Sequence, residues 1–198
     1  MVLSRFKKNK KDKLASDDRP SDSGSDAPND SKGQQLNLLI IEDDSEQMEL
    51  LVSFALSEMQ KLLDDQSTSE KQKEKIKSIK IIPTTNIETL QKILSQYKNT
   101  FWVLMDCNIP DTKDGKPHDQ LIKTNHAITG RHKTVDLIID NLPGTPITMI
   151  STLNRFEKIV HKYYANKGDL DINFINKSDQ EMIRRNVAYY LRQHLKNI

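Results

Sequence analysis

The chain has 198 residues, of which 35% are hydrophobic and 29% are charged, and its formal net charge is +2. This length fits one domain with additional tails, and the low hydrophobic share indicates that part of the chain joins no core. The near balance of charges argues against a protein that binds nucleic acid with its whole surface.

Residues 1–34 are predicted to form a disordered tail. A basic patch at residues 5–13 precedes a Ser/Asp/Pro/Gly stretch at 16–33, and neither half offers the apolar periodicity of a folded element. We interpret the patch as a solvated tail, and contact with nucleic acid or anionic lipid is the less favoured alternative.

Five apolar runs have the length of strands, and each is bounded by polar or turn-forming residues. These predicted strands span residues 36–41, 79–83, 101–105, 146–150 and 170–175.

Helical periodicity or capping signals separate these runs. Asp44 is predicted to cap the first helix, and a capping box that starts at Ser178 opens the last one. The polar stretch 64–75 is interpreted as a connection. The five predicted helices span about 44–62, 87–97, 133–141, 156–164 and 178–195.

The segment from Pro110 to Arg131 shows no clear period and contains Gly115, Pro117 and Gly130. We therefore predict a long loop, inserted at about residues 112–131 of a domain that spans 35–198. His118, His126 and His132, in this segment and directly after it, match no common metal-ligand spacing and are interpreted as solvated. The loop is expected to flank the site rather than extend the core.

Five strands that alternate with helices predict a parallel sheet covered on both faces. In such sheets ligands bind at the carboxyl ends of the strands. Three acids follow two of these strands, which suggests a site for a divalent cation. The residues at the strand ends are Glu42, Asp43, Asp106, Ser151 and Lys177.

This set, in this order, resembles the receiver domain of bacterial two-component response regulators. The string Asp106-Cys107-Asn108-Ile109-Pro110-Asp111 is also similar to the loop that follows the phosphoacceptor in that family. The resemblance covers residues 36–198 and implies a flavodoxin-like (βα)5 fold, a doubly wound parallel sheet of five strands.

The resemblance also implies roles for individual residues. Asp106 would accept the phosphoryl group, Lys177 would supply a positive charge, and Ser151 would be the switch hydroxyl. Phe174 would be the switch aromatic. Mg²⁺ would be held by Glu42, Asp43, Asp106 and the backbone carbonyl of Asn108, since it prefers oxygen ligands.

The function implied is that of a stand-alone receiver, a signalling module rather than an enzyme. It would take phosphate from a sensor histidine kinase or a histidine phosphotransfer protein and signal through an unidentified downstream protein. No run of 18 apolar residues is present and Cys107 is the single cysteine, so we expect a cytoplasmic protein without a membrane span.

Two alternatives belong to other functional classes. The first is a non-phosphorylated pseudo-receiver that acts as an interaction scaffold. Its evidence is the insertion and Ser178, which follows Lys177 where the family usually has proline; the complete set of acids, hydroxyl and lysine is evidence against it. A phosphatase of the haloacid dehalogenase type also uses Asp, Ser or Thr, Lys and Mg²⁺. That family needs a second aspartate two residues after the nucleophile, where this chain has Asn108.

Overall fold

The structure is a computed structural model that describes residues 35–123, 128–152, 154–165 and 170–196. The predicted tail at 1–34, with its basic patch at 5–13, lies outside the described residues. So does part of the segment predicted as a loop, residues 124–127.

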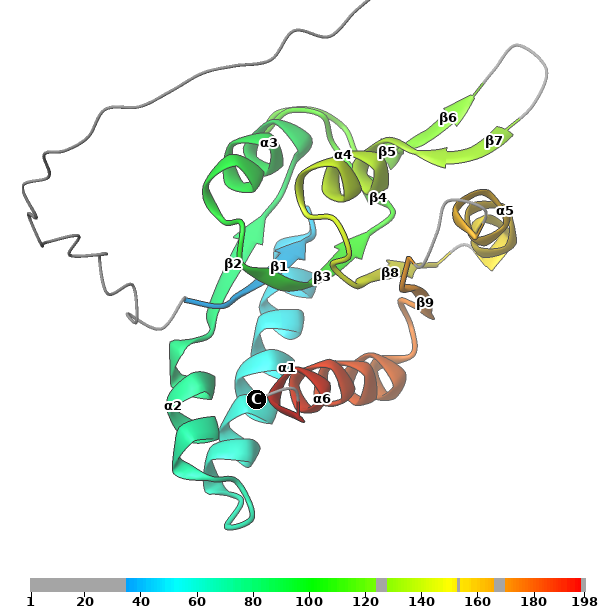
Figure 1. The fold of residues 1–198 in the computed structure, drawn as a ribbon. Helices are drawn as coiled ribbons and strands as arrows, with labels where there is room; N and C mark the ends of the chain where they lie inside the picture. Colours follow the sequence, from blue (N-terminus) through cyan, green and yellow to red (C-terminus); the bar gives the residue numbers. More distant parts are fainter. Residues whose placement is uncertain (1–34, 124–127, 153, 166–169, 197–198) are drawn as a thin grey trace, which may run out of the picture. The chain divides into compact units, whose positions relative to one another are not determined.

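Five strands form one parallel sheet in the order β2-β1-β3-β8-β9 (Figure 1). This is the flavodoxin-like strand order, so the predicted fold class is confirmed. Each predicted strand agrees with an observed one to within two residues. The strands are β1 (Asn37–Ile41), β2 (Lys80–Thr84), β3 (Thr100–Asp106), β8 (Ile147–Ser151) and β9 (Ile172–Asn176).

The three inner strands are almost entirely buried, as expected for strands covered on both faces. Every residue of β1 and β8 is buried, and in β3 only Phe101 is partly exposed. The two edge strands mix buried and exposed positions. Pro83 lies in β2, where the sheet edge tolerates a residue without a backbone N–H.

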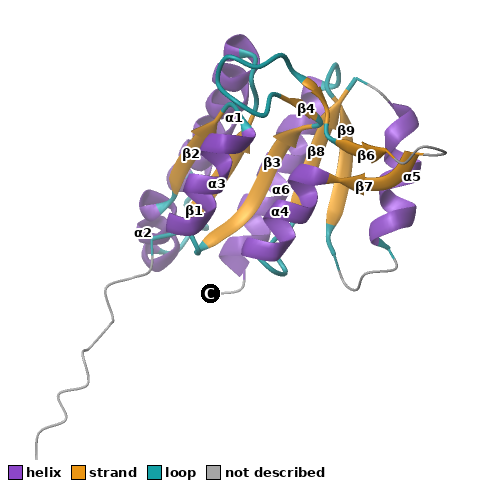
Figure 2. Ribbon diagram, turned by 90° about the horizontal axis from the view of Figure 1, so that it is seen from above, coloured by secondary structure: helices purple, strands orange, loops and turns teal. Residues whose placement is uncertain are grey.

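Helices cover both faces of the sheet (Figures 1 and 2). Leu39 and Ile41 join the core under α3, α4 and α5, while Leu38 and Ile40 face α1 and α6. No helix among the described residues is long and apolar enough to cross a membrane. The helices that cover the sheet are α1 (Ser45–Asp64), α3 (Ile87–Gln96), α4 (Lys133–Asn141), α5 (Asn154–Tyr164) and α6 (Gln180–Lys196).

The structure confirms the predicted cap of the first helix and shifts that of the last helix by one residue. The Asp44 side chain accepts hydrogen bonds from the backbone N–H groups of Glu46 and Gln47, which confirms it as the cap of α1. At α6 the prediction was off by one residue: Asp179, not Ser178, accepts from the Met182 N–H. Ser178 instead bonds to Asn176, the last residue of β9.

The interpretation of residues 64–75 as a plain connection is wrong. A helix, α2 (Glu70–Ser78), occupies part of it and continues to the start of β2. Ser69 and Gln72 form a capping box at its start. Ile76, which has no exposed surface, is the one buried residue of α2, so the helix has almost no apolar periodicity to reveal it.

The expectation of an irregular loop at 112–131 is wrong for much of that segment. Two small antiparallel sheets lie outside the main one: β5 pairs with β4, which precedes the segment, and β6 pairs with β7. Leu121 joins the core, so the insertion both flanks the site and adds to the core. The strands are β4 (Asn108–Ile109), β5 (His118–Asp119), β6 (Leu121–Lys123) and β7 (Ile128–His132).

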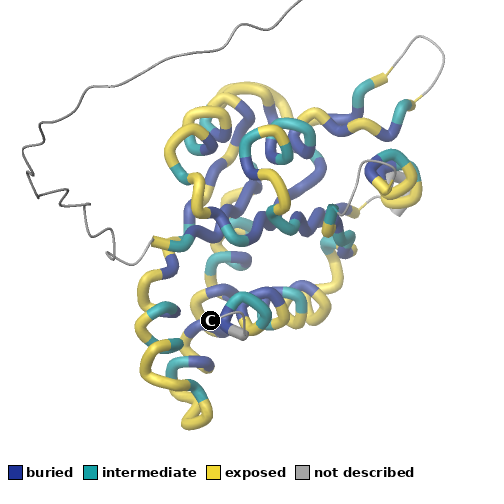
Figure 3. The backbone as a smooth tube through the Cα atoms, in the orientation of Figure 1, coloured by how far each residue is buried: buried dark blue, intermediate teal, exposed yellow. Residues whose placement is uncertain are grey.

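Strand β7 packs closely against α5, and Gly130 makes this approach possible. A Cβ atom at Gly130 would lie 2.5 Å from the backbone oxygen of Ile159, and the φ angle of Gly130 is +79°. Both features require glycine. Figure 3 shows the buried strands of the main sheet between helices whose outer faces are exposed.

Candidate functional site

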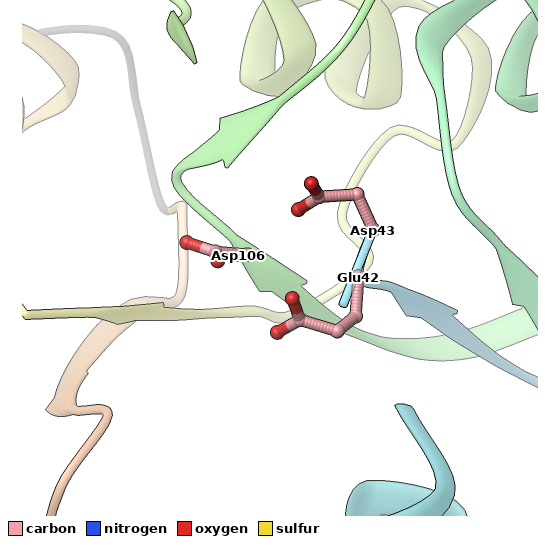
Figure 4. Close-up of side chains that lie close together, drawn as sticks. All are labelled: Glu42, Asp43 and Asp106. Carbon is pink, nitrogen blue, oxygen red and sulfur yellow. The ribbon is translucent and has the colours of Figure 1, made fainter. Parts of the chain in front are cut away.

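Three carboxylates meet at the carboxyl end of the sheet. Glu42 and Asp43 follow β1 directly, and Asp106 is the last residue of β3, the strand beside β1. The register pairs Ile41 with Met105, which brings Glu42 level with Asp106. One oxygen of each carboxylate lies within 4.8 Å of the others (Figure 4). The convergence predicted from the sequence is therefore present.

Lys177 reaches this cluster from two strands away. It follows β9, and its backbone N–H donates to the Ser151 carbonyl at 3.0 Å. Its Nζ atom lies 2.7 Å from Oδ2 of Asp106, 3.0 Å from Oε1 of Glu42 and 2.9 Å from Oε2. One ammonium group thus joins the acids at the ends of β1 and β3.

Burial and charge repulsion shape the protonation of the site. Burial, followed by repulsion from Asp106, raises the pKa of Glu42 to about 7, although Lys177 opposes the shift. Burial also raises the pKa of Asp43. For Lys177, desolvation is the largest single effect and lowers the pKa, but the bonds to Asp106 and Glu42 together outweigh it and raise the pKa. The cluster therefore carries more negative charge than one lysine compensates.

The donor set fits Mg²⁺, which binds oxygen ligands and in proteins uses one or two carboxylates with several waters. All three side chains offer carboxylate oxygens. Burial and Asp106 raise the pKa of Glu42, and a nearby cation would favour the ionised form of this carboxylate and so oppose that shift. The Asn108 N–H donates to Oδ1 of Asp106 at 3.1 Å, which places that residue beside the acids. Its carbonyl as a metal ligand remains a prediction.

Ser151 ends β8, the strand between β3 and β9, and its side chain is buried. Ile150, the residue before it, pairs with Asp106, and Ser151 forms a hydrogen bond with the Cys107 thiol. Burial raises the pKa of this thiol to about 12, so Cys107 is uncharged near neutral pH. The predicted switch hydroxyl thus lies at the site, beside the residue that follows Asp106.

Phe174 lies in β9, where it pairs with Met149 and is partly buried against the core under α5. Its ring centroid is 4.9 Å from that of His161 on α5. This contact is one of packing between sheet and helix. A switching role for Phe174 remains a prediction.

Two buried side chains near the site were missed by the sequence interpretation. Gln120 lies in the insertion and His132 directly follows it at the end of β7, and both contact backbone carbonyls of the loop after Asp106. The expectation that His132 is solvated is wrong, since it is 2% exposed. The one signal in the sequence for the burial of His132 is its position directly before α4, whose inner face is apolar.

Comparison with solved structures finds receiver domains of response regulators. RcsB of Salmonella typhimurium is 12% identical with a TM-score of 0.48, and the match covers 81% of this chain and 61% of RcsB. A receiver domain from Rhodospirillum rubrum is 15% identical with a TM-score of 0.46, covering 78% of this chain and 92% of that one. The N-terminal receiver domain of a Bacteroides fragilis regulator is 14% identical with a TM-score of 0.40, covering 79% and 96%.

No protein-family model and no curated protein matches the sequence. The fold class of the chain rests on its own strand order. The order β2-β1-β3-β8-β9 is the arrangement of the flavodoxin-like class, as the sequence predicts.

Proposed function

We propose that the chain is a receiver that accepts a phosphoryl group on Asp106 from a sensor histidine kinase or a histidine phosphotransfer protein. The observation that carries this proposal is the position of Lys177, whose ammonium group bridges Asp106 and Glu42 at the end of the sheet. A partly buried lysine that pairs with two of three clustered acids is arranged to stabilise negative charge at those acids.

In the proposed reaction a carboxylate oxygen of Asp106 attacks the phosphorus of the donor. A new O–P bond forms, the P–N bond of the phosphohistidine breaks, and the bonding electrons leave with the imidazole. Lys177 can shift its hydrogen bond from Asp106 to a phosphoryl oxygen, and the Ser151 hydroxyl can donate to another. These two residues approach Asp106 from the ends of β8 and β9.

Mg²⁺, held by Glu42, Asp43, Asp106 and the Asn108 carbonyl, would neutralise negative charge on the transferred group. The acids of this chain keep the site anionic without it. The raised pKa of Glu42 means that protons compete with a cation for this carboxylate near pH 7.

The main alternative remains a pseudo-receiver that uses the fold as a scaffold. The presence of all three acids, the buried Ser151 and the engaged Lys177 supports phosphorylation over this alternative. In the proposed role the protein is a cytoplasmic signalling module, and phosphorylation changes which downstream protein it binds. Self-catalysed phosphorylation and dephosphorylation belong to this proposal.

Incubation with acetyl phosphate and Mg²⁺, followed by intact mass spectrometry, tests the proposal. We expect a labelled species that disappears with EDTA and in Asp106→Asn. Asp140→Asn, an exposed carboxylate on α4, is the matched control and should label like wild type. Equal labelling of Asp106→Asn, or an unlabelled wild type under all conditions, would refute the proposal and favour the scaffold.

A further inference from the structure

Backbone carbonyls of the loop after Asp106, residues 107–111, accept hydrogen bonds from other parts of the chain. The N-terminus of α3 fixes its far end, because the N–H groups of Ile87 and Glu88 donate to the carbonyls of Pro110 and Asp111, each at 3.0 Å. Nearer to Asp106, the Ile109 carbonyl accepts from Gln120 of the insertion, and the Cys107 carbonyl accepts from His132, the residue that follows the insertion. These two carbonyls flank Asn108, the predicted carbonyl ligand of the metal.

Gln120 holds the Ile109 carbonyl. Its Nε2 atom lies 2.7 Å from the Ile109 oxygen and 3.0 Å from Nδ1 of His118. A carbonyl oxygen can only accept, so the amide must present its NH₂ group there. Gln120 is 4% exposed, and a buried amide placed against a buried loop is a specific contact rather than a chance one.

His118 extends this contact toward the end of the loop. With Nδ1 facing the amide of Gln120, Nε2 faces Oδ2 of Asp111 at 3.4 Å. Lys133, at the start of α4, donates to the other oxygen of Asp111 at 2.7 Å. The loop is therefore tied to the insertion at Ile109 and again at Asp111.

His132 holds the Cys107 carbonyl. Its Nε2 atom lies 3.3 Å from that oxygen, and the ring is buried. The backbone of His132 is fixed in turn by Tyr164 on α5, whose hydroxyl accepts from the His132 N–H at 3.0 Å and also lies 3.1 Å from the His132 carbonyl. The position of this imidazole is thus set by two elements, β7 and α5.

We propose that Gln120 and His132 are positioning residues of the metal site, which they shape by clamping the backbone on both sides of Asn108. This inference rests on the proposed function, because it assigns the insertion a role in Mg²⁺ binding at Asp106. Groups that orient metal ligands from outside the coordination sphere typically change metal affinity when they are removed. The insertion is then part of the site and not a tolerated surface addition.

The test measures Mg²⁺ affinity of the full chain by calorimetry, together with backbone hydrogen exchange of residues 107–111. Gln120→Met and His132→Leu remove the donors while keeping most of the side-chain volume. We expect each to raise the Kd for Mg²⁺ by about tenfold or more and to speed exchange in the loop. His132→Gln, which can present an amide N–H near the position of Nε2, should recover most of the affinity.

Thr129→Val is the control within the β6–β7 hairpin, the antiparallel pair that begins after Gln120 and ends at His132. Thr129 donates to the Ile122 carbonyl at 2.6 Å and does not contact the Asp106 loop by that bond. Its loss weakens the hairpin without releasing the clamp, so the Kd should stay within about twofold of wild type. An equal loss of affinity in Thr129→Val would overturn the proposal, because hairpin stability alone would then explain the effect.

Unchanged Kd values in folded Gln120→Met and His132→Leu would also overturn the clamp, while leaving the proposed function intact if wild type binds Mg²⁺ and is labelled. A wild type that binds no Mg²⁺ refutes the proposed function, and the clamp as a metal-positioning device falls with it. If Gln120→Met does not fold, the comparison of His132→Leu with His132→Gln decides the question alone.

Discussion

Replacing Glu42 by glutamine should stabilise the metal-free protein at neutral pH, and the gain should vanish in acid. Glu42 is fully buried, and its pKa is raised from 4.5 to about 7. The folded state binds the proton of the Glu42 carboxyl more tightly than the unfolded state does. The stabilisation of the fold by protonated Glu42 is therefore fully present below pH 4.5 and is lost as the pH rises through 7, whereas glutamine stays neutral throughout. At about 1.4 kcal/mol per pH unit, the loss between pH 5 and pH 8 is roughly 2–3 kcal/mol.

Urea unfolding in EDTA at pH 5 and pH 8 measures this effect. The free energy of unfolding of Glu42→Gln minus that of wild type should increase by about 2–3 kcal/mol from pH 5 to pH 8. Glu49→Gln, an exposed carboxylate of α1, is the control and should show a much smaller change. A difference for Glu42→Gln that does not depend on pH would refute the account of a buried, crowded carboxylate.

Three further outcomes follow from packing and hydrogen bonding. Ile76→Ala should lower the free energy of unfolding by about 2–4 kcal/mol, since this side chain alone anchors α2 in the core, and an effect below about 1 kcal/mol would contradict that role. Gly130→Ala should lower the free energy of unfolding by about 1–3 kcal/mol from its backbone conformation alone, and hydrogen exchange of α5 should become faster. A mutant with the stability of wild type would show that β7 does not approach α5 so closely. Tyr164→Phe should cost about 1–3 kcal/mol in thermal or urea unfolding because the His132 N–H loses its acceptor, and a neutral result would exclude that bond.

The sheet was predictable because its strands are buried on both faces. Runs such as Leu38–Ile41 and Trp102–Met105 are continuously apolar, which fixes both their strand character and their central place. Once the strands are parallel, residues that follow them must meet at one edge, so Glu42, Asp43 and Asp106 could be brought together from the sequence alone.

Helix α2 and the strands of the insertion were not predictable on the same grounds. Helix α2 buries only Ile76, so its sequence reads as a polar connection and depends on its capping box and on tertiary contact. Strands β4 and β5 are two residues long, too short for an alternating pattern. Gln120 is placed by a hydrogen bond to the Ile109 carbonyl in the loop after Asp106, and no periodicity in a single sequence reports such a contact.

The most direct test of the central claim is to locate the phosphorylated residue. The chain is incubated with acetyl phosphate and Mg²⁺, the acyl phosphate is trapped by reduction with borohydride, and peptides are mapped by mass spectrometry. Reduction converts a phosphorylated aspartate to homoserine, so the modified residue is identified by its mass. We predict homoserine at position 106 in a Mg²⁺-dependent fraction of the protein. Modification only at another residue, or none in a protein that binds Mg²⁺, would contradict the assignment of Asp106 as the phosphoacceptor.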